Sequence, residues 1–182
     1  EIVKAIEGGY SFRSSLFSSN INAYYTMWEN KPSNGGVTVM VDDIPYRANI
    51  NGMDALHKGI EMDFAYKLIH NLTLEGLASL GDWTWNSANK VWFFNENNQP
   101  ILEAGEHANR EFDAIGVHVG DAAQTQYGLS IRYEPTYVSY IKLRGTYFDN
   151  YYADFDPLSL NGENSGRESW KIPSYNLIDL HA

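Results

Sequence analysis

The chain has 182 residues, a formal net charge of −10 and no cysteine. The acidic balance argues against a nucleic-acid partner, because phosphate binding needs clustered Lys and Arg, and the missing thiols exclude a disulfide framework and thiolate chemistry. No apolar run approaches the ~18 to 20 residues of a transmembrane helix, which excludes a membrane protein of the helical type but leaves a β-barrel open.

The first predicted element is a hairpin of two alternating strands. Residues 2–13 place Ile6 and Tyr10 on one face and Glu7 on the other, since strand side chains alternate with period two. A short Ser14-Ser15 link leads into residues 17–28, which alternate in the same way. We expect the two strands to be antiparallel neighbours.

The next segment, residues 29–54, is predicted to be a long excursion. It holds Pro32, Asn34, Gly35 and Gly36 together with a short β-prone run at 37–41. These turn residues and Pro45 are expected to keep it out of a continuous membrane strand.

A second hairpin follows over residues 55–85, turning tightly at 67–71. In its first strand Met62 and Phe64 lie on one face and Glu61 and Asp63 on the other. One face of this hairpin is therefore apolar and the other polar.

The remaining chain repeats the scheme of long strands joined by alternating short and long connections. A second excursion, 86–120, precedes strands at 121–133 and 137–150, joined by a tight turn at Pro135, and a third excursion, 151–169, leads to a last strand at 170–182. The pattern predicts an all-β, antiparallel up-and-down transmembrane β-barrel segment of about seven long strands. Short turns are expected on the periplasmic side and long loops on the extracellular side.

Charged residues alternate with apolar ones inside these strands. A basic side chain facing lipid near the bilayer midplane would cost about 2 to 4 kcal/mol, and an acidic one less. We therefore expect the charged side chains within the spans to face a polar lumen; they are Glu61, Asp63, Glu75, Arg132, Lys142 and Arg144.

Several stretches resemble a known family. The chain reads LHKGIEMD at 56–63, NLTL at 71–74, GDWTW at 81–85, VGDAAQT at 119–125, YFDNYYADFDP at 147–157 and WKIPSYNLIDL at 170–180. In this order they resemble the C-terminal β-barrel of TonB-dependent outer-membrane receptors of the Bacteroidetes type, over about residues 2–182.

The resemblance implies active uptake of a ferric siderophore or another large nutrient through a plugged barrel in the bacterial outer membrane. Implied partners are outer-membrane lipid, the remaining barrel strands and plug of the same receptor, TonB acting through that plug, and the nutrient. The sequence departs from the family because no plug domain or TonB box is visible within 1–182 and the last residue is Ala182, not an aromatic. On its own this segment is not expected to transport anything.

No catalytic, metal or cofactor motif stands out, so we expect a protein that is not an enzyme. The five histidines form no zinc-protease helix motif. His118, near Asp113 and Asp121, is a weak metal candidate, and Asp149, Asp154 and Asp156 lack the spacing of an EF-hand loop.

Aromatic rings in the excursions are the best candidates for ligand contact. Rings that alternate with Asn and Asp can stack on a ligand while amides and carboxylates bind its polar edges. The other interpretation is an aromatic girdle at the membrane surface together with packing between loops. The candidate residues are Trp83, Trp85, Trp92, Phe93, Phe94, Tyr151, Tyr152 and Phe155.

Two other functional classes remain open from the sequence. One is a secreted all-β carbohydrate-binding module or adhesin domain, since such proteins are also rich in Tyr and Trp. The other is a small self-contained outer-membrane barrel with a structural or passive-pore role.

Overall fold

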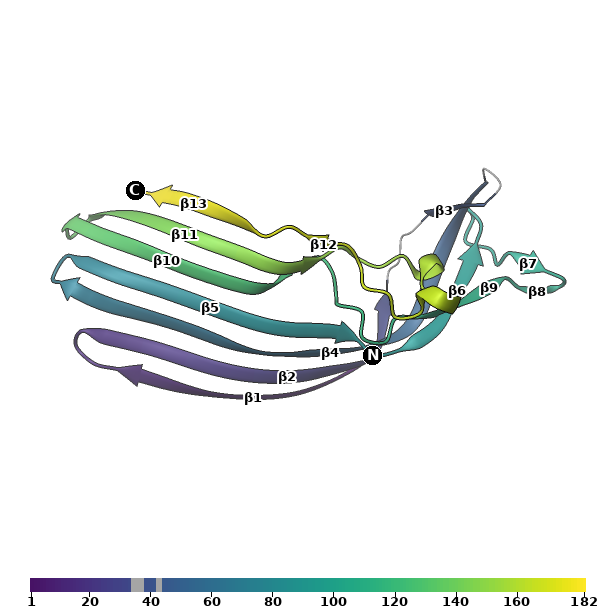
Figure 1. Ribbon diagram of the computed structural model, residues 1–182, viewed down its shortest axis with the longest axis horizontal. Coiled ribbons are helices and arrows are strands. Elements are labelled where there is room, and N and C mark those ends of the chain that lie inside the picture. Colours follow the sequence, from purple (N-terminus) through teal and green to yellow (C-terminus); the bar gives the residue numbers. More distant parts are fainter. Residues whose placement is uncertain (34–37, 42–43) are drawn as a thin grey trace.

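The computed structural model describes residues 1–33, 38–41 and 44–182, and it is an all-β protein with antiparallel up-and-down strands. One large sheet contains all the long strands in the order β1-β2-β4-β5-β10-β11, with β13 pairing with the far side of β11 (Figure 1). Their bounds are β1 Ile2–Arg13, β2 Phe17–Ser33, β4 Ile44–Ile69, β5 Leu72–Trp85, β10 Ala123–Thr136, β11 Ser139–Tyr152 and β13 Tyr175–His181.

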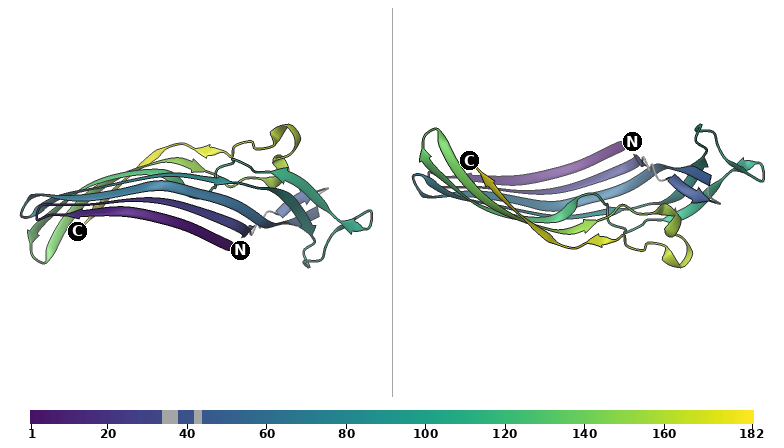
Figure 2. Two further views of the ribbon diagram at one scale, coloured as in Figure 1. Left: turned by 90° about the horizontal axis from the view of Figure 1, so that it is seen from below. Right: turned by 90° about the horizontal axis from the view of Figure 1, so that it is seen from above.

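The sheet is open and bowed along its strands (Figure 2). In the described part of the chain β1 pairs only with β2, and β13 pairs only with β11. The outer edges of β1 and β13 therefore carry backbone groups with no strand beside them.

The two ends of the sheet differ. At one end three tight turns join β1 to β2, β4 to β5 and β10 to β11, whereas the long excursions all lie at the other end (Figure 1). We call the described parts of the excursions together the extension, made of residues 29–33, 38–41, 44–54, 86–122 and 153–170. The predicted alternation of short and long connections is thus confirmed.

Besides β3, the extension contains short strands and two 3-10 turns that the sequence did not predict. β6 pairs with β4 and with β9, while β7 and β8 form a separate two-stranded sheet. The bounds are β3 Thr38–Val41, β6 Ala88–Phe94, β7 Leu102–Glu103, β8 Glu106–His107, β9 Asn109–Asp113, η1 Pro157–Ser159 and η2 Gly162–Asn164; β12 Lys171–Ile172 follows the extension. The β-prone run at 37–41 becomes β3, except for position 37, which lies outside the described residues.

The excursion predicted over residues 29–54 includes strand residues at both of its ends, because β2 continues to Ser33 and β4 begins at Ile44. Pro45 is the second residue of β4 and is opposite Met40 of the short strand β3. The register of the β2–β4 pair shifts after Trp28 and again after Lys31. Near these shifts Asn30 (φ 53°) and Gly52 (φ 74°) have positive φ. These bulges bend the strands and let them continue into the extension.

The last predicted strand is also shorter than expected. Residues 170–182 form two strands, β12 and β13, separated by Pro173 and Ser174. Proline has no backbone N–H to donate to a ladder, which explains the break.

The predicted alternation of side chains is confirmed across the whole sheet. Cross-strand registers align Met62, Ala78, Tyr127 and Tyr147 in one row, with similar rows above and below it. We call this surface the apolar face; its large apolar side chains include Ile6, Tyr10, Phe12, Phe17, Ile21, Tyr25, Ile60, Met62, Phe64, Tyr66, Leu72, Leu74, Leu80, Tyr127, Leu129, Ile131, Tyr133, Ile141, Leu143, Tyr147, Ile178 and Leu180. Most of these side chains are exposed, including Leu129 at 57% and Leu143 at 53%.

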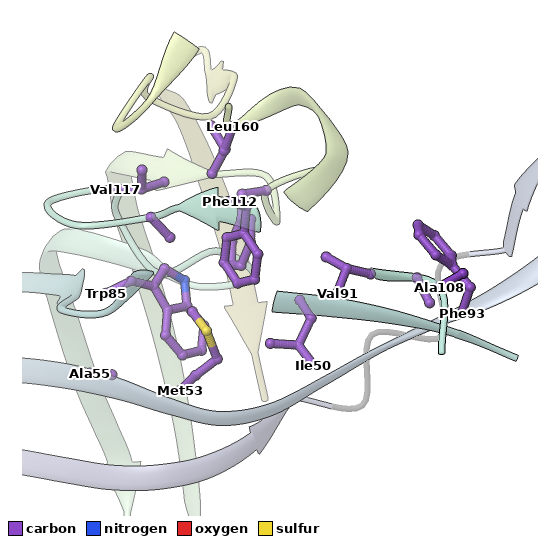
Figure 3. Packing of buried hydrophobic residues seen from close by; sticks show 13 residues of the cluster. Ile50, Met53, Ala55, Trp85, Val91, Phe93, Ala108, Phe112, Val117 and Leu160 are labelled. Atoms are coloured by element: carbon purple, nitrogen blue, oxygen red, sulfur yellow. The ribbon is translucent and has the colours of Figure 1, made fainter. Parts of the chain in front are cut away.

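The buried hydrophobic cluster lies in the extension and not under the sheet. Trp85 and Phe112 lie within this cluster (Figure 3). Trp85 packs edge-on against Phe155, with ring centroids 5.7 Å apart, and Phe155 stacks on Phe112 with centroids 5.8 Å apart. Met53, Val91 and Val117 are fully buried in the same cluster. The extension thus has a small hydrophobic core of its own at the end of the sheet.

Gly120 lies where two excursions approach each other closely. A Cβ atom at Gly120 would be 2.6 Å from the Asp154 amide nitrogen and 2.7 Å from the Ala153 carbonyl carbon. Both contacts are to backbone, so the two excursions would have to separate to accept a side chain.

We expect Gly120→Ala to lower the free energy of unfolding by about 1 to 3 kcal/mol, the usual cost of overpacking. Denaturant unfolding followed by tryptophan fluorescence measures this change. Gly145→Ala is the matched control, because a Cβ at Gly145 would meet nothing within 4 Å. Equal effects of the two substitutions would contradict the close approach at Gly120.

Candidate ligand-binding face

The second surface of the sheet, which we call the polar face, carries carboxylates, amides and hydroxyls. The Asn20 amide donates to both carboxylate oxygens of Asp63 at 3.1 and 2.8 Å, and the Ser11 hydroxyl donates to Asn20 at 2.6 Å. These residues line a hollow of about 670 Å³ that also includes Asn22, Glu61 and Ser79. The polar face is thus a recessed surface with preorganised polar groups.

All six charged residues predicted to share one face do lie on the polar face. Glu75 accepts hydrogen bonds from Lys142 and from the Ser130 hydroxyl, the latter at 3.1 Å. Arg132 pairs with Glu134 at 2.8 Å, and Arg144 lies opposite Asp179 in the register. A second hollow, of about 260 Å³, lies among these groups. It is lined by Asp63, Glu75, Ser130, Lys142 and Arg144.

Towards the extension the polar face becomes aromatic. The Trp83 indole N–H donates to the Tyr24 hydroxyl at 2.8 Å, and the Trp83 ring stacks on the His57 ring with centroids 5.4 Å apart. The His57 and Trp28 ring centroids are 6.2 Å apart, and the Lys31 ammonium lies 5.1 Å from the Trp28 ring centroid. Tyr24, Trp28 and His57 extend the ligand-contact candidates beyond the predicted set, and only the strand registers bring them beside Trp83.

The structure separates the eight predicted ligand-contact residues into two groups. Four are buried with exposures of 6 to 8% and pack inside the extension or against its base; they are Trp85, Phe93, Tyr152 and Phe155. Four remain partly exposed; they are Trp83, Trp92, Phe94 and Tyr151. Only the second group can touch a ligand without rearrangement.

Two of the partly exposed rings form a small cluster around His107. The Trp92 and Phe94 rings each lie 4.9 Å from the His107 ring, and His107 Nε2 is 2.9 Å from the Phe93 carbonyl oxygen. Trp92 and Phe94 share one side of β6 because they are two residues apart. This cluster lies at the extension and is distinct from the Trp83 array on the polar face.

A hollow of about 590 Å³ lies on the other side of β6. Its walls include Tyr46, Phe93, Ile101 and Leu158, and Arg110 and Glu103 lie at its edge. Arg110 donates to both Glu103 carboxylate oxygens at 2.9 Å, and this contact lowers the pKa of the Glu103 carboxyl.

His118 has other partners than the acidic residues nearest to it in sequence. It bonds Glu168 through Nδ1, lies 3.8 Å from Asp82 through Nε2, and stacks on Tyr152 with ring centroids 4.2 Å apart. Among the residues that the structure describes, no three His, Asp or Glu side chains converge as a metal site requires. His118 instead ties the third excursion to the end of β5.

Gln124 is a structural residue that sequence reasoning missed. Its buried amide accepts from the Trp83 backbone N–H at 2.8 Å and donates to the carbonyls of Trp83 and Val119 at 3.1 Å each. It thereby holds the Trp83 backbone, and hence the ring, against the second excursion. A glutamine within an alternating strand gives no sequence signal for this role.

Comparison with known protein families, with curated proteins and with solved structures finds no match to this chain.

In the described ranges, no helix is both long enough and apolar enough to cross a bilayer.

We expect Gln124→Leu to destabilise the protein by about 1 to 3 kcal/mol, because buried backbone groups lose their partners. Denaturant unfolding measures this change, and altered quenching of tryptophan fluorescence by acrylamide reports the loosened Trp83. Gln126→Leu is the matched control, since the Gln126 side chain donates only to the Ala123 carbonyl at 3.2 Å. We call these hydrogen bonds of Gln124 to the Trp83 and Val119 backbone the Gln124 clamp. A Gln124 variant no less stable than the control would contradict this role of Gln124.

Proposed function

We propose that this chain is part of the β-barrel of a TonB-dependent nutrient receptor in a bacterial outer membrane. The proposal joins the resemblance to Bacteroidetes-type receptors with the two-faced sheet. The observation that carries it is the apolar face, which extends over seven strands and is not covered by any other described element.

Such a surface is unusual for a protein in water. Soluble monomers seldom expose contiguous apolar patches larger than a few hundred Å². Burying exposed Leu, Ile or Met side chains in an apolar medium is favourable by roughly 1.5 to 3 kcal/mol each. Contact with lipid hydrocarbon provides that medium for the whole face at once.

The charges fit the same arrangement. Inside the long strands Glu75, Lys142 and Arg132 lie on the polar face, where ion pairs and hydrogen bonds satisfy them. In the proposed barrel this face lines the lumen, which avoids the cost of about 2 to 4 kcal/mol for a basic residue at the bilayer midplane.

The open edges support a larger assembly. A strand edge with unpaired N–H and C=O groups is costly in hydrocarbon, so β1 and β13 would each pair with a further strand of the same receptor. The receptor's plug would occupy the space beside the polar face and connect the barrel to TonB. In this arrangement the segment forms part of the barrel wall, and the plug provides the connection to TonB.

The proposed ligand contacts follow from the two ends of the sheet. The tight turns correspond to the periplasmic side and the extension to the cell surface, where the nutrient arrives. Trp83, Trp92, Phe94 and Tyr151 are the predicted contacts that remain partly exposed there. They would stack on a ferric siderophore, an oligosaccharide or another large nutrient.

The secreted-module alternative has less support. A β-sandwich buries the inner faces of two sheets against each other, whereas here the large buried hydrophobic residues of the described chain gather in the extension. A small self-contained barrel would need the sheet to close on itself, and β1 does not pair with β13 in the described residues.

The proposal is tested by uptake in cells that carry the intact polypeptide. We expect the protein in the outer-membrane fraction, and accumulation of one probe from a panel of radiolabelled ferric siderophores, cobalamin and oligosaccharides. Deleting the polypeptide, deleting TonB or adding a protonophore should each abolish that accumulation. Release of the protein into the medium, or accumulation that persists without TonB, would contradict the proposal.

A further inference from the structure

The three tight turns at one end of the sheet carry, or lie directly beside, large apolar side chains that are exposed to an unusual degree. Tyr137 and Val138 in the third turn are fully exposed, Leu16 in the first turn is 55% exposed, and Leu68 and Ile69, the last two residues of β4 before the second turn, are 46% and 57% exposed. Turns in contact with water are normally built from Gly, Asn, Asp, Ser and Pro. We call these five residues the turn tips.

The turn tips belong to one continuous rim. The Lys67 amide donates to the Leu16 carbonyl at 2.8 Å, which joins the first turn to the second. The Glu134 amide donates to the Asn71 carbonyl at 2.8 Å, which joins the second to the third. The apolar side chains therefore lie on neighbouring turns held in a fixed order.

Several polar groups of these turns are satisfied within the turns. The Ser14 hydroxyl donates to the Phe17 carbonyl at 3.1 Å and accepts from the Phe17 amide at 3.0 Å. The Thr136 and Ser139 hydroxyls lie 2.6 Å apart and bond each other. This internal bonding lowers the cost of placing the turns where water is scarce.

Charges mark only one border of the apolar face. At the border near the extension, Lys58 and Asp82 form an ion pair of 2.9 Å on the apolar face itself. At the turn end, Lys67, Arg132 and Lys142 share one register row on the polar face. The apolar face therefore continues into the turn tips without a charged boundary.

The length of the apolar face along β5 also indicates that this face continues into the turn tips. From Leu80 to Leu72 there are eight residue steps, or roughly 26 Å along the strand, which becomes about 20 Å at a tilt near 40°. The apolar band of outer-membrane barrels is about 25 Å tall. In β5 the strand residues alone therefore leave about 5 Å of such a band uncovered, and the turn tips lie beyond the Leu72 end, where they can cover it.

We propose that the turn tips insert into the boundary between headgroups and acyl chains of one phospholipid leaflet, and so set the depth of the sheet in the membrane. The inference rests on the proposed function, because it requires the apolar face to be in lipid. Tyr137 suits this position, since its ring is apolar and its hydroxyl can reach the headgroups. The occupant of this rim is lipid and not a periplasmic protein.

The test uses spin labels on single cysteines, which the cysteine-free segment allows. Val138→Cys is compared with Leu129→Cys on the apolar face and Gln126→Cys on the polar face. The intact polypeptide, with any cysteine elsewhere replaced by serine, is placed in vesicles of phosphatidylethanolamine and phosphatidylglycerol. Collision rates with oxygen and with a water-soluble nickel chelate then report the surroundings of each label.

We expect the label at Val138 to collide more with oxygen than with the chelate, at a shallower depth than the label at Leu129. A chelate accessibility at Val138 equal to that at Gln126, with Leu129 still in lipid, would overturn the inference and leave the proposed function standing. Chelate accessibility at Leu129 as well would overturn both.

The role in setting depth has its own readout. Combining Leu68→Asp and Val138→Asp should move the Leu129 label by up to about 5 Å, the height that the turn tips cover. Thr73→Asp, opposite Lys67 on the polar face, is the control. An unchanged depth of the Leu129 label in the double variant would overturn the anchoring role.

Discussion

The structure depends on one constraint, which is that a single-layered sheet must find a suitable medium for each of its faces. Hydrogen bonds between neighbouring strands satisfy the interior backbone, but no second layer of the described chain covers the side chains of β1, β2, β4, β5, β10 and β11. The period of two then sorts apolar groups to one face and polar groups to the other. In the proposed receptor barrel, lipid on one side and water on the other would stabilise both.

The extension solves a different physical problem at the end of the same strands. On the extension side of the Lys58–Asp82 ion pair, the buried hydrophobic residues form one cluster that includes Trp85 and Phe155. The Gln124 clamp and the His118–Glu168 contact fasten that core to the sheet. Aromatic residues near the sheet end therefore divide between core packing and a surface that a ligand can reach.

The sequence predicted the features that depend on local pattern. Alternation and tight turns are short-range signals, and the long strands, their faces and the asymmetry of the connections follow from them. The extension of β4 back to Ile44 was not predicted, because it depends on pairing with β3 and β6 and on bulges at Asn30 and Gly52 that only strand pairing defines. The burial of Trp85 and Phe155 and the role of Gln124 were missed for the same reason, since each requires contacts between segments distant in sequence.

The most direct measurement is the reaction of a water-soluble maleimide with single cysteines placed in turn at positions 126 to 133 of β10, in cells that express the intact polypeptide. If the sheet is part of the proposed receptor barrel, labelling alternates, with rapid reaction at the polar-face positions 126, 128 and 132 once the lumen is open to reagent, and slow reaction at 130, which is buried beside Glu75. Positions 127, 129, 131 and 133 should stay unreactive until the membrane is dissolved. Uniform labelling along β10, or reactivity greatest at the apolar positions, would contradict the claim that the two faces lie in lipid and water.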